Sequence, residues 1–315
     1  MTPWPSPVLI DAAQTSAALP FAKLVAALRD GFVAGAQAPL RHRHALGPAE
    51  TLLLMPAWQG RGALGVKIVS VFADNGKRGL NAVSSTYLLC DGQTGRHIAV
   101  LDGNEITGRR TAAASALAGS YLARAEARTL LIVGSGHVAS LLAPAWRAVR
   151  PIARVMVWNT RPAGAERLAG ELRAAGFDAS AVADLRTAVG QADIVSCATL
   201  ATTPLVHGAW LRAGTHLDLI GAYQPAMREA DDEAVRRARL FIDTEAALAE
   251  AGDIIQPLQA GVITRDDVRG GLADLCRGSV TGRQNDTEIT LFKSVGTAIE
   301  DLAAAMLVAR ELGLL

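Results

Sequence analysis

Two glycines and an alanine in the middle of the chain have the spacing of a phosphate-binding loop. Residues 130–140 read LLIVGSGHVAS, which places Gly134, Gly136 and Ala139 in a GxGxxA pattern. An apolar strand is expected before this loop, a helix after it, and a second strand, RVMVWN, about 20 residues further on. The first glycine permits a tight turn, the second lets a pyrophosphate approach the backbone, and the small third residue lets the helix pack on the strand. In this context the pattern predicts a dinucleotide site.

The end of the second predicted strand bears on which dinucleotide is bound. An NAD-preferring fold usually has Asp or Glu here, whereas this chain has Asn159, Thr160 and Arg161. A guanidinium can make a charge-assisted contact with a 2′-phosphate, so the pattern favours NADP(H), with NAD(H) still possible. The alternative is that Arg161 is a solvated residue at the start of a helix.

Three cations precede the glycine loop and could hold an anionic substrate: Arg41, Lys67 and Arg110. Lys67 interrupts an apolar strand, LGVKIVS, so its ammonium group must reach either solvent or a polar cavity. Arg110 and its neighbour Arg109 are expected to precede a helix of small residues, which Thr111 would cap. The alternative for both arginines is ordinary polarity at a helix start.

Charge balance and the histidine and cysteine patterns narrow the classes of protein, and we expect a soluble, cytoplasmic protein with a small-molecule partner. The 31 Lys and Arg residues nearly balance 30 Asp and Glu, and half of the residues are hydrophobic. This balance does not suggest a nucleic-acid or membrane partner. The histidines form no metal-ligand pattern, and Cys90, Cys197 and Cys276 are expected to be free thiols. GSGHVAS has no serine at its centre, so a hydrolase elbow is not supported.

The elements expected around these residues fall into two patterns. Residues 18–35 predict a helix that ends at Gly35, and residues 51–58, 63–74 and 83–103 predict a mostly antiparallel sheet with a hairpin at DGQTG. From about residue 128 short apolar strands alternate with helices, which predicts an α/β, Rossmann-type doubly wound parallel sheet. Residues 287–313 are expected to form one long helix that packs back on the first domain. The predicted domains are 1–125 completed by 292–315, for substrate binding and dimerisation, and 126–291, for NAD(P) binding.

Several stretches together resemble the ornithine cyclodeaminase/mu-crystallin family over nearly the whole chain. They are LDGNEITGRRTAAASALA, LLIVGSGHVAS, VWNTRPAGAERLA, TLATTPLV, GAYQPAMREAD and TEITLFKSVGTAIEDLAAA, of which RTAAAS and FKSVG are the most specific. The resemblance implies a Rossmann domain, a second domain that forms a homodimer, and action on small imino or amino acids with NAD(P)(H).

The resemblance also implies roles for individual residues. Arg41, Lys67 and Arg110 would surround the substrate carboxylate, with Lys67 shuttling a proton. The remaining implied contacts are with the cofactor: Thr111, Gly134, Gly136 and Ala139 at the pyrophosphate, Asn159, Thr160 and Arg161 at the adenosine ribose or its phosphate, Thr199 near the nicotinamide half, and Lys293 and Ser294 from the returning helix. No metal is implied.

Two departures from the cyclodeaminase pattern suggest a different reaction. The catalytic aspartate of the family's cyclodeaminases matches Tyr223 here, and their glutamate before the Met-Pro pair matches Leu53. Leucine cannot bind a distal ammonium group, and a tyrosine with a pKa near 10 is a poor base. We therefore expect reduction of a cyclic ketimine carboxylate, with Tyr223 a possible substrate-side residue. The alternatives are an ornithine cyclodeaminase, an alanine-dehydrogenase-like enzyme, and an NADPH-binding protein without turnover.

Overall fold

The computed structural model describes residues 5–48 and 50–315, which divide into two compact units. Unit 1 comprises Met1–Arg110 and Thr297–Leu315, and unit 2 comprises Thr111–Gly296. This division lies at residues 110 and 296, whereas the boundaries predicted from sequence were 125 and 291. The predicted roles of the two domains stay predictions.

Unit 1 is built on a mostly antiparallel sheet. Among the described residues its strands have the order β1-β6-β5-β4-β3-β2, and only the pairing of β1 with β6 is parallel. The strands are β1 (Val8–Ile10), β2 (His42–Ala45), β3 (Glu50–Gln59), β4 (Ala63–Phe72), β5 (Val83–Asp91) and β6 (His97–Asp102). The antiparallel strands and the β5–β6 hairpin confirm the sequence prediction.

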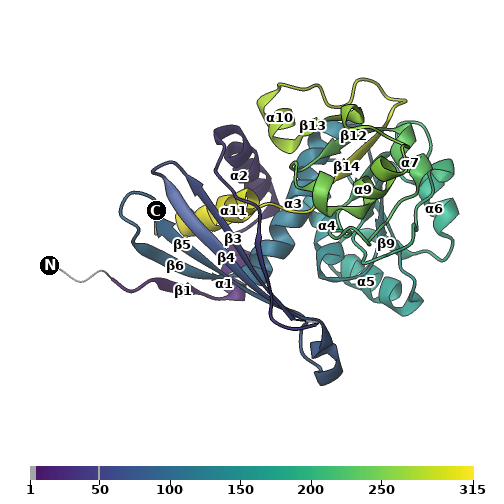
Figure 1. Cartoon of the computed structure of the whole chain (residues 1–315). Helices are drawn as coiled ribbons and strands as arrows, with labels where there is room; N and C mark the ends of the chain where they lie inside the picture. Colours follow the sequence, from purple (N-terminus) through teal and green to yellow (C-terminus); the bar gives the residue numbers. More distant parts are fainter. Residues whose placement is uncertain (1–4, 49) are drawn as a thin grey trace. The chain divides into compact units, whose positions relative to one another are not determined.

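Helices from both ends of the chain pack with this sheet. They are α1 (Ala12–Ala17), α2 (Phe21–Ala34) and α11 (Ala298–Glu311). α2 ends at Gly35, as predicted, because its φ of 75° is readily adopted only by glycine. α11, yellow in Figure 1, contacts α2 and strands β3, β4 and β5. Its return to the first domain was therefore predicted correctly.

The helix that carries Arg110 begins earlier than predicted. α3 (Gly103–Leu122) starts directly after β6, and the Asp102 carboxylate accepts a hydrogen bond from the Glu105 N–H at 2.8 Å. Thr111 therefore lies in the helix interior and is not an N-cap. The sequence reading failed because Gly103 and Gly108 are poor helix formers, and tertiary packing overrode that preference.

Unit 2 contains a parallel sheet in a doubly wound order, which confirms the predicted fold class. Among the described residues its order is β13-β12-β14-β11-β10-β7-β8-β9. The chain runs from β7 through β8 to the edge strand β9, and it then returns to form β10 on the other side of β7. The strands are β7 (Thr129–Val133), β8 (Arg154–Trp158), β9 (Asp178–Ala181), β10 (Ile194–Cys197), β11 (His216–Leu219), β12 (Ala238–Ile242), β13 (Val268–Gly271) and β14 (Ile289–Lys293).

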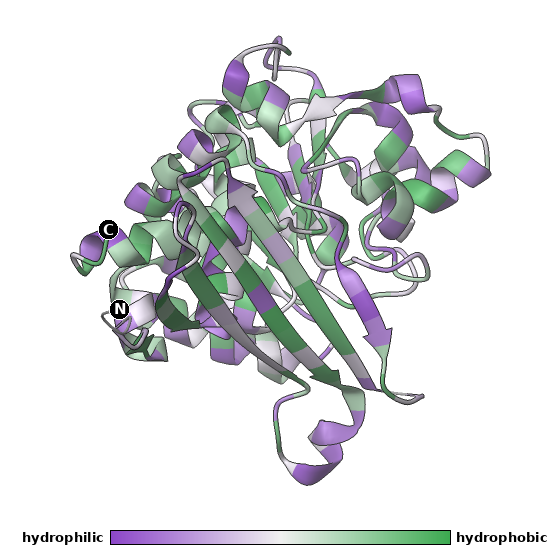
Figure 2. Ribbon diagram, turned by 60° about the vertical axis from the view of Figure 1, so that its left-hand side comes forward, coloured by the Kyte–Doolittle hydropathy of each residue, from purple (hydrophilic) through white to green (hydrophobic). Residues whose placement is uncertain are grey.

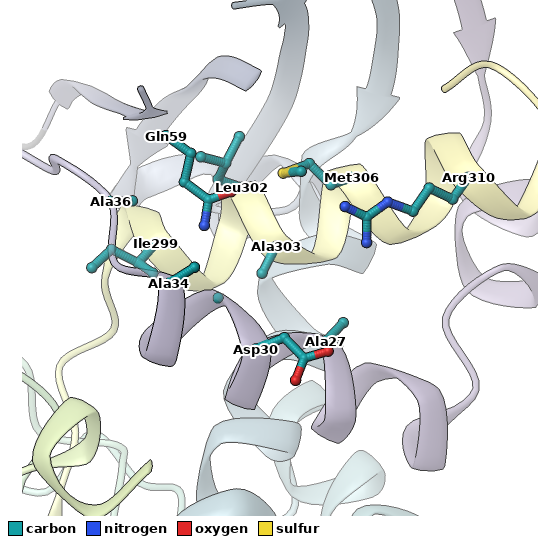
Figure 3. A pocket seen from close by; sticks show the side chains of 11 residues that line it. Ala27, Asp30, Ala34, Ala36, Gln59, Ile299, Leu302, Ala303, Met306 and Arg310 are labelled. Carbon is teal, nitrogen blue, oxygen red and sulfur yellow. The ribbon is translucent and has the colours of Figure 1, made fainter. Parts of the chain in front are cut away.

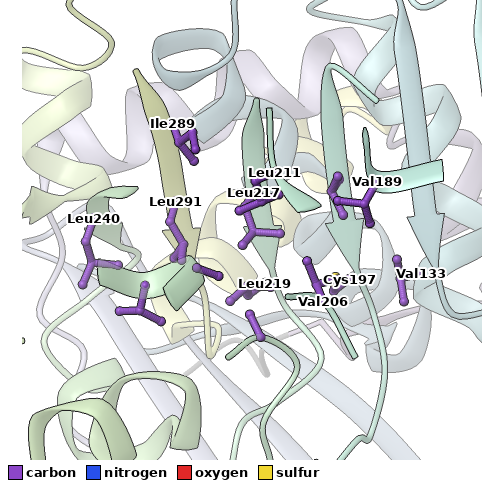
Figure 4. Packing of buried hydrophobic residues seen from close by; sticks show 14 of the residues in the cluster. Val133, Val189, Cys197, Val206, Leu211, Leu217, Leu219, Leu240, Ile289 and Leu291 are labelled. Carbon is purple, nitrogen blue, oxygen red and sulfur yellow. The ribbon is translucent and has the colours of Figure 1, made fainter. Parts of the chain in front are cut away.

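Helices connect these strands, and apolar residues from both fill the core of unit 2. The helices are α4 (His137–Arg147), α5 (Pro162–Ala174), α6 (Leu185–Gln191), α7 (Asp232–Arg237), α8 (Ala247–Glu250), α9 (Gly252–Gln259) and α10 (Leu272–Arg277). Figure 4 shows the side chains of Val133, Cys197, Leu219 and Leu291 gathered along neighbouring strands. Continuous burial of this kind explains why the strands read as unbroken apolar runs.

The segment 287–313 is not one helix. Its first part forms β14, whose five residues are all buried between β11 and β12. The chain then turns at Gly296, where φ is 78°, and α11 begins after Thr297, whose hydroxyl caps the Ile299 N–H. A short apolar run fits a buried strand and a helix equally well, so sequence periodicity could not separate them.

Within the described residues, no helix has both the length and the apolar character needed to cross a membrane.

The contact between α3 and α4 in unit 2 leads to a stability prediction. A Cβ added at Gly119 would lie 2.0 Å from a ring carbon of the buried Trp146, whereas one added at Gly170 in α5 meets nothing closer than 3.8 Å. We expect Gly119→Ala to lower the free energy of unfolding by about 2 kcal/mol through overpacking. The control Gly170→Ala should raise it by about 0.5 kcal/mol, because alanine favours the helix. Urea unfolding measures both, and equal effects would contradict the close packing of Gly119 on Trp146.

Candidate functional site

A buried cluster of cations and carboxylates forms the polar centre of unit 1. Lys67 lies on β4 and is 2% exposed; its Nζ is 2.9 Å from the Asp301 carboxylate and 3.1 Å from the Thr107 hydroxyl. Arg110 reaches the same carboxylate, since its Nε lies 3.0 Å from Asp301, and its Nη1 lies 2.8 Å from Glu300. Lys67 therefore points into a polar interior rather than into solvent.

The protonation states in this cluster follow from burial and from the neighbouring charges. Burial lowers the pKa of Lys67 to about 8; Asp301 opposes this shift, and Arg110 and Arg41 add to it. Burial by itself would raise the pKa of Asp301, but Lys67 and Arg110 hold it below its ordinary value. Lys67 is thus a cation at neutral pH that loses its proton as the pH rises through about 8.

Arg41 is the third predicted cation. It is half-buried before β2, and its charge lowers the pKa of Lys67, so the two groups are electrostatic neighbours. The structure thus brings Lys67 and Arg110 onto one carboxylate and places Arg41 within electrostatic range of Lys67. A substrate carboxylate as their ligand stays a prediction.

The glycine loop of unit 2 has the form that a bound pyrophosphate requires. Gly134 has a φ of 116°, and an added Cβ would lie 2.6 Å from the Ala198 carbonyl oxygen. A Cβ at Gly136 would meet nothing within 4 Å, so open space lies above the N-terminus of α4, which no side chain caps. Ala139 is fully buried in the first turn. These residues fit a dinucleotide phosphate at the helix N-terminus.

The residues after β8 are arranged beside this loop. The Asn159 Nδ2 donates to the Ser135 hydroxyl at 2.8 Å, which fixes the Asn159 side chain against the glycine loop. Thr160 and Arg161 are both exposed, and Arg161 precedes α5. Their accessibility is compatible with the predicted ribose contact and equally with a solvated helix start.

The remaining predicted residues of unit 2 lie at or near the carboxyl ends of strands. Thr199 follows β10, and the 40% exposed Tyr223 follows β11. Lys293 and Ser294 lie at the end of β14 and not on a returning helix. Both side chains are buried: the Lys293 Nζ pairs with Asp253 at 2.8 Å, and the Ser294 hydroxyl donates to Asp243 at 2.9 Å.

A cavity of about 140 Å³ lies elsewhere in unit 1, between α2 and α11. Figure 3 shows its wall of small and apolar side chains, including Ala27 and Ala303, with Asp30 and Arg310 at its polar positions. Its lining does not include Lys67, Arg110 or Asp301. The candidate residues of unit 1 therefore lie outside this cavity.

Sequence reasoning missed the carboxylates that hold the candidate residues. Glu300 and Asp301 pair with the cations of unit 1, and Glu229 and Asp253 surround Lys293; all four are fully buried. A signal was present for the first pair, because two adjacent acidic residues open the otherwise apolar helix AIEDLAAAMLVA. Such residues are almost never fully buried unless they are paired.

The order of the parallel sheet and the glycine loop at its strand reversal define a Rossmann-type dinucleotide-binding α/β protein. Residues 12–312 match the ornithine cyclodeaminase/mu-crystallin family, and the chain belongs to that family.

Three proteins are similar to this chain over most of its length. A Delta(1)-pyrroline-2-carboxylate reductase of Paracoccus denitrificans is 45% identical over 288 residues, which is 91% of each chain. The structure of the Thermococcus litoralis Delta(1)-pyrroline-2-carboxylate reductase in complex with NADH and L-proline is 35% identical, has a TM-score of 0.92, and covers 96% of this chain and 97% of its own. An archaeal alanine dehydrogenase dimer with bound NAD is 28% identical, with a TM-score of 0.91 and coverage of 97% and 95%.

The ion cluster of unit 1 leads to a second stability prediction. Asp301→Asn should lower the free energy of unfolding by about 3 kcal/mol, because it leaves buried cations without full compensation. Glu311→Gln, on the same helix, breaks the surface pair with Lys23, whose side chain is 56% exposed, and should cost less than about 1 kcal/mol. Denaturant unfolding of both variants tests this difference. If both variants lost the same small amount of unfolding free energy, water would already screen the charges of the ion cluster.

Proposed function

We propose that this protein reduces a cyclic imino acid with a nicotinamide dinucleotide. The observation that carries the proposal is the cluster of Lys67 and Arg110 on Asp301, in a chain whose unit 2 has a phosphate loop. The reductases named above support the same reaction class. The candidate substrate is Δ1-pyrroline-2-carboxylate or Δ1-piperideine-2-carboxylate, which differ by one ring carbon.

The residues of unit 1 bind and orient the substrate in this proposal. Arg110, Lys67 and Arg41 attract its carboxylate, and the Lys67 ammonium keeps the ring nitrogen protonated, which makes the C=N carbon electrophilic. Asp301 holds Lys67 and Arg110 in fixed positions. The bound dinucleotide supplies the hydride. In unit 2, the proposed pyrophosphate contacts are Gly134, Gly136, Ala139 and Thr111, and Thr199 is the proposed contact on the nicotinamide side.

Two positions argue against deamination of ornithine. Leu53 is a half-buried residue of β3 paired with Val69, and Tyr223 is an exposed phenol after β11. Neither provides a carboxylate that could bind a distal ammonium group or accept its proton. Reduction needs neither group, because the substrate already contains the C=N bond.

Substrate and product assays separate the candidate activities. The purified protein is incubated with each cyclic imino acid and NADPH or NADH, and separately with ornithine or alanine and NAD. Oxidation of the reduced cofactor with formation of proline or pipecolate supports the proposal. Proline and ammonia from ornithine, without reductase activity, would identify a cyclodeaminase. Tight cofactor binding with no turnover of any substrate would identify a binding protein.

We also propose that NADP(H) is preferred over NAD(H), through Arg161. Arg161→Ala should weaken NADPH at least tenfold and NADH less than twofold, because only NADPH has a 2′-phosphate to lose a charge-assisted contact. Arg154→Ala is the control, since Arg154 is exposed at the opposite end of β8. Calorimetric dissociation constants for both cofactors decide the matter. Equal weakening of NADPH and NADH would refute the preference.

The reduction should slow at alkaline pH. Lys67 acts as an ammonium group in this proposal and its pKa is about 8, so kcat/KM should fall as pH rises through 8. Asp301→Asn removes the carboxylate that raises this pKa, so the fall should move to lower pH. The profile from about pH 6 to 9.5 is measured for both proteins, with Glu311→Gln as the control. An unshifted profile in Asp301→Asn would exclude Lys67 as the titrating group.

We propose, further, that the protein is a homodimer that associates through the sheet of unit 1. On one face of β4, three large apolar side chains are exposed: Leu64, Ile68 and Phe72 are 36%, 41% and 37% exposed. In Figure 2 the long central strands of this sheet carry green, hydrophobic segments that are interrupted by grey and purple ones. An apolar sheet face of this kind is typical of an interface, and the archaeal relative is a dimer.

Ile68→Lys should convert the dimer to a monomer, because a two-fold interface buries the new charge twice. Leu312→Lys is the control, since Leu312 is 43% exposed at the end of α11 and not on the sheet. Light scattering at micromolar concentration measures both masses. A dimeric Ile68→Lys variant would exclude this face.

A further inference from the structure

A buried lysine between two buried carboxylates forms a second charged cluster, in unit 2. The Lys293 Nζ lies 2.8 Å from Asp253 and 3.7 Å from Glu229, and none of the three side chains is exposed. Asp253 also accepts hydrogen bonds from the N–H groups of Glu229 and Ala230, at 2.7 and 3.2 Å. Lys293 and Asp253 therefore fix both the side chain and the backbone of Glu229.

The Glu229 carboxylate in turn holds two loops. One oxygen, Oε1, accepts from the Thr199 N–H and from the Thr199 hydroxyl, both at 2.8 Å. The other, Oε2, accepts from the N–H groups of Gly221 and Ala222, at 2.8 and 3.1 Å. Four donors from two loops thus converge on one side chain.

These loops lie at one defined place in the sheet. Thr199 follows the carboxyl end of β10, and Gly221 follows the carboxyl end of β11. β10 is the neighbour of β7, across the point where the strand order reverses. In a Rossmann-type fold the glycine loop after the first strand holds the adenosine side of a dinucleotide, so the loops after β10 and β11 would meet the other mononucleotide.

The two loops are packed without spare room. A Cβ added at Gly221 would lie 2.1 Å from the Thr199 carbonyl oxygen and 2.6 Å from Glu229 Oε1. The carboxylate therefore bridges two loops that approach each other closely at Gly221. Burial raises the pKa of Glu229 to about 7, and the Lys293 charge opposes that shift, which favours the ionised form that accepts all four hydrogen bonds.

We propose that Glu229 is a positioning residue for the nicotinamide half of the cofactor, and that Lys293 acts through Glu229 and Asp253 rather than by touching the cofactor. The inference rests on the proposed function, because it presupposes a nicotinamide dinucleotide. It leaves the adenosine half to the glycine loop and to the residues that follow β8.

Binding of cofactor fragments tests this division. Glu229→Gln keeps the side-chain volume but turns one acceptor into an NH₂ donor that faces N–H groups of a loop. We expect it to weaken NADPH and NADH at least tenfold while ADP and 2′,5′-ADP, which lack the nicotinamide nucleotide, bind within twofold of the unmodified protein. The fluorescence of the bound reduced nicotinamide should also change. Glu245→Gln, at an exposed pair with Arg265 in unit 2, is the matched control.

A milder substitution tests the same inference if Glu229→Gln fails to fold. Thr199→Val removes one of the four donors and leaves the Thr199 N–H in place, so it should weaken the intact dinucleotides in the same direction by about threefold, again without effect on ADP. Equal weakening of ADP and NADH, or no change in either variant, would overturn the inference alone. Failure of the unmodified protein to bind any dinucleotide would overturn the proposed function, and the inference with it.

Discussion

The ion pair between Lys67 and Asp301 is the constraint on which the chemistry of unit 1 depends. A lysine buried in a sheet is costly unless a carboxylate compensates it, and Asp301 does so from a helix more than two hundred residues away in sequence. The same carboxylate binds Arg110, so one acidic residue sets the position of two cations. Burial makes the lysine a weaker base, and the carboxylate limits that effect.

Unit 2 also contains a buried carboxylate that is paired with a buried lysine, but there the carboxylate holds two loops together. Glu229 is buried among backbone N–H groups, and Lys293 supplies the compensating charge. In both units the residue that resembles a ligand contact in the sequence is held by an acidic partner. Charged side chains in the interior therefore act largely through one another, because a low-dielectric surrounding strengthens each contact and penalises any unpaired group.

The sequence predicted the fold class because the hydrophobic patterns of the two units differ. Unbroken apolar runs such as TLLIV indicated buried parallel strands, and glycine and turn residues marked the hairpin at DGQTG. The same patterns failed at two places. Residues 289–293 looked like part of a helix but form β14, and α3 begins at Gly103 although glycine disfavours helices. Both errors occurred where packing against distant elements outweighed local preference.

The sequence by itself determined the residue types: a glycine loop that only small side chains can form, cations before it, and family motifs over nearly the whole chain. Only the tertiary structure decided which charges meet. Asp301 with Lys67, and Glu229 with Lys293, are far apart along the chain, and their pairing depends on strand order and helix packing. A residue's charge is local information, whereas its pKa and its partners are set by burial, which is a property of the folded chain.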